Sequence, residues 1–198
     1  WECRGFQALG AMGSNRFADQ PGLACRPFDR DHDGFIYGEC SGALVIESMG
    51  SSRKRAVRPY ARLAGWGIAM DGNRNPDPSL EGETRAIQNA LASAEWSAAQ
   101  VDYVNPHGTG SVIGDETELA ALRASGLAEA RLNASKSLLG HGLSAAGAVE
   151  AIATLLQMHE GKLHPTRNLD NPIDPGMNWV GSSAVLHPIQ YALTLSMG

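Results

Sequence analysis

The sequence predicts an α/β layered fold, and two observations support that prediction. Short runs rich in β-branched and aromatic residues alternate along the 198 residues with longer stretches that have helical spacing. The composition, 43% hydrophobic and 19% charged, is that of a globular chain able to bury a core. Strands that alternate with helices favour a layered arrangement, and no internal repeat or low-complexity linker interrupts the pattern.

The first third of the chain is predicted to be mostly extended. Residues 33–48, "DGFIYGECSGALVIES", predict two strands joined by a Gly/Ser-rich bend. Residues 58–70, "RPYARLAGWGIAM", predict another strand that passes two glycines. Between them, the basic run "SSRKRAVR" at 51–58 is interpreted as a solvated turn. The turn-formers "DGNRNPDP" at 71–78 predict an exposed loop.

The remainder alternates more regularly. Residues 82–96 place Ile87, Leu91 and Ala94 at helical spacing and predict an amphipathic helix. Gly and Ala lie on several faces of the long helix predicted at 141–162, which indicates burial on more than one side. The further predicted elements are a strand at 101–105, a helix at 114–126, a strand at 132–136, the long helix at 141–162, and strands at 177–185 and 191–198.

Charge and composition exclude several classes of function. The net charge of -5 argues against a nucleic-acid-binding surface. No apolar run approaches the roughly 20 residues that span a bilayer, and the first ten residues lack the shape of a signal peptide. Cys3, Cys25 and Cys40 are an odd number without paired spacing. This predicts no disulfide framework and no zinc site, and a reducing cytoplasm as the location.

Two histidines lie where catalytic groups gather. His107, between Pro106 and Gly108, directly follows a predicted strand, and ligands of α/β sheets bind at strand ends. The alternative is a histidine that caps a turn. His141 opens the predicted long helix, where the positive end of the dipole keeps an imidazole neutral and able to donate one hydrogen bond. The alternative here is an ordinary first-turn residue.

Glu150 is anomalous because Ala, Val, Ile and Leu surround it in "AAGAVEAIATLL". A buried carboxylate costs several kcal/mol unless it is paired, so Lys136 is the expected partner and a solvated helix stripe is the alternative. "GDETE" places Asp115 and Glu118 in the first turn of a helix, where the dipole favours carboxylates. A metal site from these groups and His107 matches no familiar ligand spacing.

Three ordered stretches together resemble the β-ketoacyl-acyl-carrier-protein synthases of the thiolase superfamily. They are "RPFDRDHDGFIYGECSGALVIES" at 26–48, "VNPHGTGSVIGDETE" at 104–118 and "SKSLLGHGLSAAGAVEA" at 135–151, followed by the ending "LSMG". The resemblance implies the C-terminal part of a thiolase-like αβαβα layered fold, with a mixed sheet flanked by helices. Residues 1–50 would end the N-terminal half, and 51–198 would form the C-terminal half, truncated before its last loop.

The resemblance also implies roles for the candidate residues. His107 and His141 would polarise a thioester carbonyl, and Lys136 and Glu150 would form the ion pair that orders the site. Thr109 and Ser111 would contact phosphopantetheine, with Asp115 and Glu118 supporting the site from behind. No metal or nucleotide cofactor is implied, because the substrate arrives on the phosphopantetheine arm of an acyl carrier protein, the implied partner. The resemblance further implies a homodimer that binds neither nucleic acid nor a membrane.

The departures from the family pattern matter as much as the matches to it. In these synthases a cysteine at a strand–helix elbow holds the acyl group, in a segment that precedes the region matching Trp1. Cys3, Cys25 and Cys40 lack that context and are interpreted as structural; Cys40 stands where the family commonly has Gly. We therefore expect a missing N-terminal portion or a partner chain, and a large exposed apolar face where it packs.

Within the family, "FQALGAMGSNRF" and "HPIQYALTLSMG" look most like the ketosynthase-like proteins of polyketide β-branching cassettes. The resemblance implies decarboxylation of malonyl-carrier protein to acetyl-carrier protein through an enolate. Alternatives are an elongating synthase that performs a decarboxylative Claisen condensation, a catalytically silent carrier-binding partner, and a metal-dependent hydrolase that uses the GDETE carboxylates.

Overall fold

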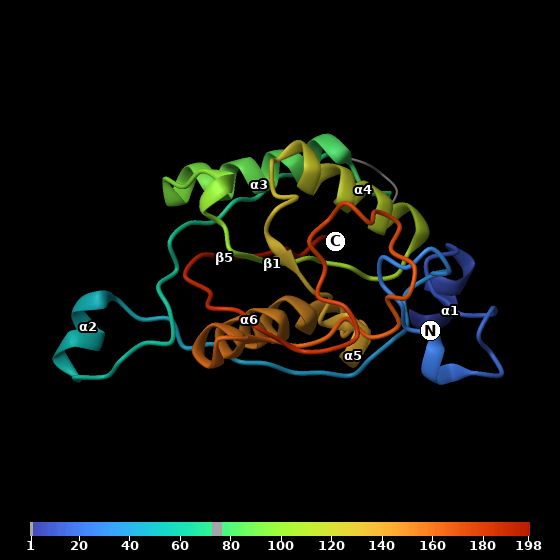
Figure 1. The fold of residues 1–198 in the computed structure, drawn as a ribbon, viewed down its shortest axis with the longest axis horizontal. Helices are drawn as coiled ribbons and strands as arrows, with labels where there is room; N and C mark the ends of the chain where they lie inside the picture. Colours follow the sequence, from blue (N-terminus) through green and yellow to red (C-terminus); the bar gives the residue numbers. More distant parts are fainter. Residues whose placement is uncertain (1, 73–76) are drawn as a thin grey trace.

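The computed structural model describes residues 2–72 and 77–198, and it is a layered α/β structure (Figure 1). A three-stranded sheet has the order β2–β1–β5, formed by Arg131–Leu132, Tyr103–Asn105 and Ala192–Thr194. Both pairings are parallel, with Tyr103 opposite Arg131 on one side and Ala192 on the other. Helices α3 (Leu80–Ala94) and α4 (Val112–Ala124) lie on one side of the sheet, and α6 (Ala146–Glu160) lies on the other.

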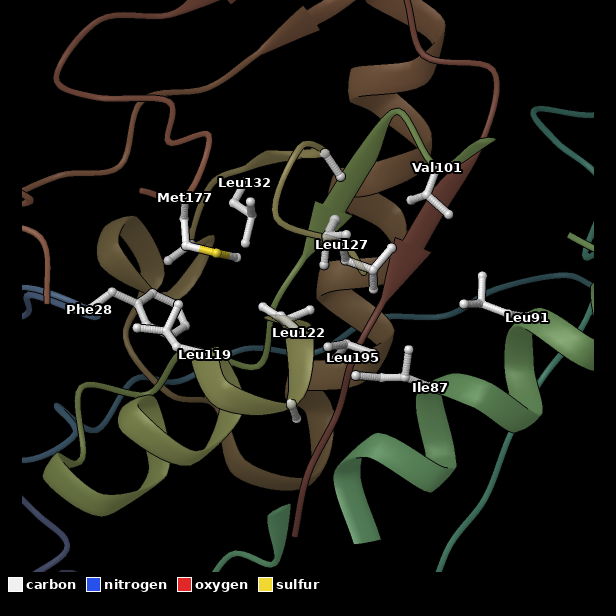
Figure 2. Packing of buried hydrophobic residues seen from close by; sticks show 14 residues of the cluster. Phe28, Ile87, Leu91, Val101, Leu119, Leu122, Leu127, Leu132, Met177 and Leu195 are labelled. Carbon is white, nitrogen blue, oxygen red and sulfur yellow. The ribbon is translucent and has the colours of Figure 1, made fainter. Parts of the chain in front are cut away.

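The main hydrophobic core lies between the sheet and the helices α3 and α4 (Figure 2). Ile87 of α3 and Leu122 of α4 have no exposed surface, and both belong to the buried cluster that includes Val104 of β1. Helical spacing in α3 therefore does what the sequence predicted: it gathers the apolar side chains on the face that covers the sheet. The core extends to Phe28, Leu119, Leu127, Leu132, Met177 and Leu195.

The predicted helices have recognisable ends. Ser79 caps α3 by accepting a hydrogen bond from the Gly82 amide at 3.1 Å. Helix α6 ends at Gly161, which adopts the left-handed conformation that glycine allows at little cost. Its start differs from the prediction, because a 3₁₀ turn at Leu143–Ala145 precedes it and His141 lies outside it.

The strands predicted at 33–48 and 58–70 are wrong. Only single bridges form in the first segment, between Met12 and Phe35 and between Tyr37 and His141. Residues 41–48 are exposed, and no described strand pairs with them. The segment 58–70 alternates small inward residues with large exposed ones, and its Gly67 lies directly against α3. Both segments thus have strand-like patterns, but among the described residues no neighbouring strand forms a hydrogen-bonded ladder with either.

Other boundaries also differ. Of the strand predicted at 132–136, only Leu132 belongs to β2, and Lys136 begins α5 (Lys136–Leu139). The predicted strand at 177–185 is reduced to a bridge between Leu132 and Trp179 and the start of β4 (Val185–Leu186). Strand β3 (Lys162–Leu163) pairs with β4 in an antiparallel ladder.

Three helices were not predicted: α5, α1 (Glu2–Ala8), and α2 (Met49–Lys54) within the basic run. Part of the loop predicted at 71–78, residues 73–76, lies outside the described residues. In the part of the chain that is described, no helix has the length and apolar content to cross a membrane.

Candidate active site

His107 lies two residues beyond the end of β1, as the sequence predicted. The carboxylate of Glu118 in α4 fixes this turn by accepting hydrogen bonds from the His107 amide at 2.6 Å and the Gly108 amide at 2.8 Å. Gly108 has φ +47°, and a side chain there would meet the ring of Phe28. Burial raises the pKa of Glu118 to about 8, while its two amide partners favour the ionised form. Glu118 therefore supports His107 from behind.

His141 is held by the segment that lies beside it. Its amide donates to the Ile36 carbonyl at 2.7 Å, and its own carbonyl accepts from the Gly38 amide at 3.0 Å. The prediction that it opens the long helix is wrong, since Gly140 ends α5 and α6 starts only at Ala146. The helix dipole acts within the first turn, so it is not what keeps this ring neutral.

The two imidazoles meet face to edge. The ring centroids of His107 and His141 are 5.2 Å apart, and the ring planes are inclined by 83°. Burial, followed by the charge of Lys136, lowers the pKa of His141 to about 4. Burial, Lys136 and His141 lower the pKa of His107 well below its ordinary value. Both rings are therefore neutral near pH 7, the state that the sequence analysis expected for His141 through a different cause.

Lys136 and Glu150 form a buried ion pair behind the histidines. The Lys136 ammonium donates to Glu150 Oε1 at 2.5 Å, and each side chain is only 2% exposed. Lys136 begins the one-turn helix α5, not a strand, and Glu150 lies on the inner face of α6. The anomaly in the sequence is thus a paired carboxylate, and the alternative of a solvated stripe is wrong. Burial raises the pKa of Glu150, and Lys136 opposes that shift.

Lys136 also fixes the proton of His107. Its ammonium donates to the His107 carbonyl oxygen and lies 3.2 Å from His107 Nδ1. An ammonium only donates, so Nδ1 of the neutral ring is the acceptor and the ring proton sits on Nε2. His141 Nδ1 is buried and has no hydrogen-bond partner among the described residues.

The other predicted residues surround the turn after His107. Thr109 Oγ1 and Ser111 Oγ lie 2.8 Å apart, next to the start of α4. Asp115 accepts hydrogen bonds from the amides of Phe28 at 2.6 Å and Gly110 at 3.0 Å, and contacts the His32 ring at 3.1 Å. Asp115 therefore joins the turn to the segment that contains Phe28.

Asp115 and Glu118, two carboxylates of the alternative metal site, accept hydrogen bonds from backbone amides instead. Within residues 2–72 and 77–198, no group of three or more His, Cys, Asp or Glu is arranged to hold a metal ion. The three thiols are free: Cys25 donates to the Lys136 carbonyl at 3.0 Å, and burial raises its pKa to about 11. Cys40 packs against Gly142, where any side chain would collide with its sulfur.

Asn105 was missed by the sequence analysis. It is fully buried at the end of β1, where its amide nitrogen donates to the Pro106 carbonyl at 3.2 Å and its oxygen accepts from the Ser135 hydroxyl at 2.6 Å. Tyr103, on the same strand, is also fully buried, and its hydroxyl donates to Asn133 at 2.5 Å. An asparagine inside the predicted strand at 101–105, directly before Pro106 and His107, is the signal that would have identified it.

The fold and the site together define a class of protein: a layered α/β structure in which two neutral histidines, backed by a buried lysine–glutamate pair, meet beside a parallel sheet. Residues 60–170 match the family model described as the C-terminal domain of beta-ketoacyl synthase. The chain belongs to this family, as the three motifs predicted.

Relatives of known name agree with this assignment. The polyketide biosynthesis malonyl-ACP decarboxylase PksF of Bacillus subtilis (strain 168) is 58% identical over 197 residues, covering 100% of this chain and 48% of that protein. The 3-oxoacyl-[acyl-carrier-protein] synthase 2 of Rhizobium meliloti (strain 1021) is 40% identical over 200 residues, covering 98% and 47%. The chain thus spans about half the length of these relatives.

Solved structures of ketosynthases share the fold. A type II polyketide ketosynthase in complex with its acyl-carrier protein matches with a TM-score of 0.90 and 32% identity, over 99% of this chain and 49% of that one. The ishigamide ketosynthase/chain length factor matches with a TM-score of 0.86 and 34% identity, over 96% and 46%. The predicted thiolase-like fold is confirmed by these neighbours.

Proposed function

We propose that the protein containing this chain decarboxylates malonyl-acyl carrier protein to acetyl-acyl carrier protein in polyketide biosynthesis. The relative with 58% identity has the name of a malonyl-ACP decarboxylase, and its match extends over the whole chain. The single structural observation that supports the proposal is the meeting of two neutral imidazoles, 5.2 Å between centroids. Such a pair suits a reaction in which negative charge develops on one oxygen.

The chemistry follows from that charge. When the malonyl thioester loses carbon dioxide, the electron pair of the broken C–C bond moves into an enolate whose oxygen becomes negative. Neutral N–H donors already aimed at this oxygen stabilise a charge that exists only beyond the ground state. The enolate carbon then takes a proton, and an acetyl thioester results. His107 would donate from Nε2, the nitrogen that Lys136 leaves protonated.

Lys136 and Glu150 would hold the histidine in place. Lys136 contacts both the ring and the carbonyl of His107, and Glu150 holds the ammonium from the other side. Removing a buried charge from this arrangement would leave the other uncompensated. The pair therefore maintains the orientation of His107 without itself touching the thioester.

The partner would be an acyl carrier protein whose phosphopantetheine arm passes Thr109 and Ser111. Their hydroxyls lie together at the turn that follows His107, within the same loop as the reacting group. A matching ketosynthase structure contains its acyl-carrier protein, which supports this choice of partner. Substrate delivered on this arm requires no further cofactor. A cytoplasmic homodimer remains the expected form.

The proposal is tested with the full-length protein that contains this chain and malonyl-carrier protein, without an acyl acceptor. Intact-mass spectrometry of the carrier should show the malonyl group replaced by acetyl over time. If the malonyl group stays intact until an acyl primer is added and is then extended, the elongating reaction is the correct one, as in the relative named 3-oxoacyl-[acyl-carrier-protein] synthase 2. If the carrier never changes, the protein is a silent partner and the proposal fails.

A further inference from the structure

The turn that contains His107 has two parts, and two carboxylates of α4 hold them. The first part carries the imidazole, and Glu118 holds it by accepting from the His107 amide at 2.6 Å. The second part, residues 109–111, carries two neighbouring hydroxyls. Asp115 Oδ1 holds this part by accepting from its central amide, that of Gly110, at 3.0 Å. The imidazole and the hydroxyls are therefore held by separate side chains of one helix.

The side chain of Asp115 is itself held by a buried histidine. Nδ1 of His32 lies 3.1 Å from Asp115 Oδ2, and the two side chains are 5% and 1% exposed. An ionised carboxylate only accepts hydrogen bonds, so the nitrogen that faces Oδ2 is the donor, His32 Nδ1–H. The same oxygen accepts from the Phe28 amide at 2.6 Å. His32 thus supplies one of the two hydrogen bonds that fix Oδ2 of Asp115.

The segment around His32 lies directly against the second part of the turn. The His32 amide donates to the carbonyl of Asp29, a fully buried residue, at 3.0 Å. Two residues beyond His32, the Gly34 amide donates to the Gly110 carbonyl at 2.9 Å. A side-chain carbon at Gly110 would lie 3.1 Å from the Gly34 carbonyl oxygen, so the two backbones are closely packed. His32 is therefore placed by a segment that already contacts the residues held by Asp115.

We propose that His32 is a positioning residue for substrate binding: by donating to Asp115 it keeps residues 109–111 in place along the path of the carrier arm. The proposal rests on the proposed function, which gives the arm that path. The ring of His107 is held separately by Lys136, whose ammonium lies 3.2 Å from Nδ1. Loss of the His32 donor should therefore weaken the binding of substrate and leave the chemical step unchanged.

The test uses two amide substitutions that differ in reach. His32→Asn places a side-chain N–H close to the position of Nδ1, whereas His32→Gln places it one carbon further out, near the position of Nε2. In the full-length protein with malonyl-carrier protein, His32→Gln should raise KM by roughly tenfold and leave kcat unchanged, because one buried hydrogen bond to a charged group is left unmade. His32→Asn should keep KM close to that of the wild type.

The matched control is His187→Gln, which should change neither constant. His187 is a partly buried histidine whose ring contacts the Asp102 carbonyl at 3.2 Å. His32→Leu, which has no side-chain N–H, is the second variant if His32→Gln does not fold, and it should raise KM equally.

A KM that stays at the wild-type value in His32→Gln, or a kcat that falls in its place, would overturn the inference while leaving the proposed function intact. A His32→Asn variant as impaired as His32→Gln would also overturn it, because the effect would not then follow the hydrogen bond to Asp115. A wild-type protein that does not decarboxylate would instead overturn the proposed function. The inference is then decided by the dissociation constant of malonyl-carrier protein, which His32→Gln should raise by the same factor and His32→Asn should not.

Discussion

Glu150 is a charged residue in a buried, largely apolar environment. It is 2% exposed in a largely apolar stretch of α6, and Lys136 is its only ionic partner among the described residues. Glu150→Ala should lower the free energy of unfolding by ~3 to 5 kcal/mol, because the lysine would remain buried without compensation. Chemical denaturation measures the change. Glu129→Ala, at an exposed site, is the control and should stay within ~0.5 kcal/mol; an equal loss in both would show that Glu150 is not energetically buried.

The lowered pKa of His141 predicts that the free energy of unfolding depends on pH. Its pKa is lowered from 6.5 to about 4 in the folded chain, so the unfolded chain binds more protons between these values. The neutral ring therefore contributes stability that is fully present above pH 6.5 and is lost as the pH falls toward 4. The wild type should lose free energy of unfolding relative to His141→Gln over this interval. Parallel pH profiles of the two proteins would contradict the assignment.

At the scale of elements, the segment 58–70 depends on glycine where it touches α3. A side-chain carbon at Gly67 would lie 2.2 Å from the Ala86 carbonyl oxygen and 2.6 Å from the Ala90 nitrogen. Gly67→Ala should therefore push the segment off the helix and destabilise the fold by ~1 to 3 kcal/mol. Thermal unfolding can be compared with that of Gly181→Ala, where no atom lies within 4 Å. If both variants unfold alike, the close packing on α3 is not required.

The elements that the sequence predicted well are those with strong local patterns. Helices α3 and α4 and strand β1 lie close to where local patterns placed them, because each helix buries one face against the sheet and all three residues of β1 are buried. The segment 33–48 failed for the opposite reason. Its β-branched residues predict a strand, but Val45 is 93% exposed and no described neighbour pairs with it. A local pattern indicates that a segment prefers the strand conformation, but it does not indicate whether a neighbouring strand is present to pair with it.

The features of the site also divide into those that the sequence predicts and those that need the structure. His107, His141, Lys136 and Glu150 could be selected from motifs and from the cost of a buried charge. The contacts of His164 with Ser135, and of Ser135 with Asn105, join residues 29 and 30 positions apart. No periodicity in the sequence encodes such contacts, since they depend on how β1, α5 and the turn after β3 pack together. The cause of the lowered His141 pKa likewise required the tertiary structure.

At the scale of the whole molecule, the early segments leave an apolar surface uncovered. Trp66, Ile68 and Met70 are 65%, 69% and 87% exposed, on the side of their segment that faces away from α3. Further exposed apolar residues are Leu44, Val45, Ile46, Tyr60 and Leu63. Large apolar side chains exposed in this way mark a surface where another protein surface packs. It agrees with the expected covering by a portion of the protein or a partner beyond these 198 residues.

The 198-residue chain prepared alone should therefore associate with itself. Sedimentation velocity should show species larger than the monomer, and replacing Trp66 and Ile68 with serine should shift the distribution toward the monomer. Replacing the exposed residues Arg4 and Glu129 with serine is the control. A stable monomer of the unaltered chain would show that this surface needs no cover.

The central claim is that the enolate forms between two neutral histidines, and the rate of the His107→Ala variant tests it most directly. With the full-length protein and malonyl-carrier protein, intact-mass spectrometry follows the loss of the malonyl carboxylate. We predict a rate lower by ~10² to 10³, the cost of removing one donor aimed at a developing oxyanion. Replacing Asp115, which contacts backbone amides and His32, should cost less. A His107→Ala variant that releases carbon dioxide as fast as the wild type would contradict the account.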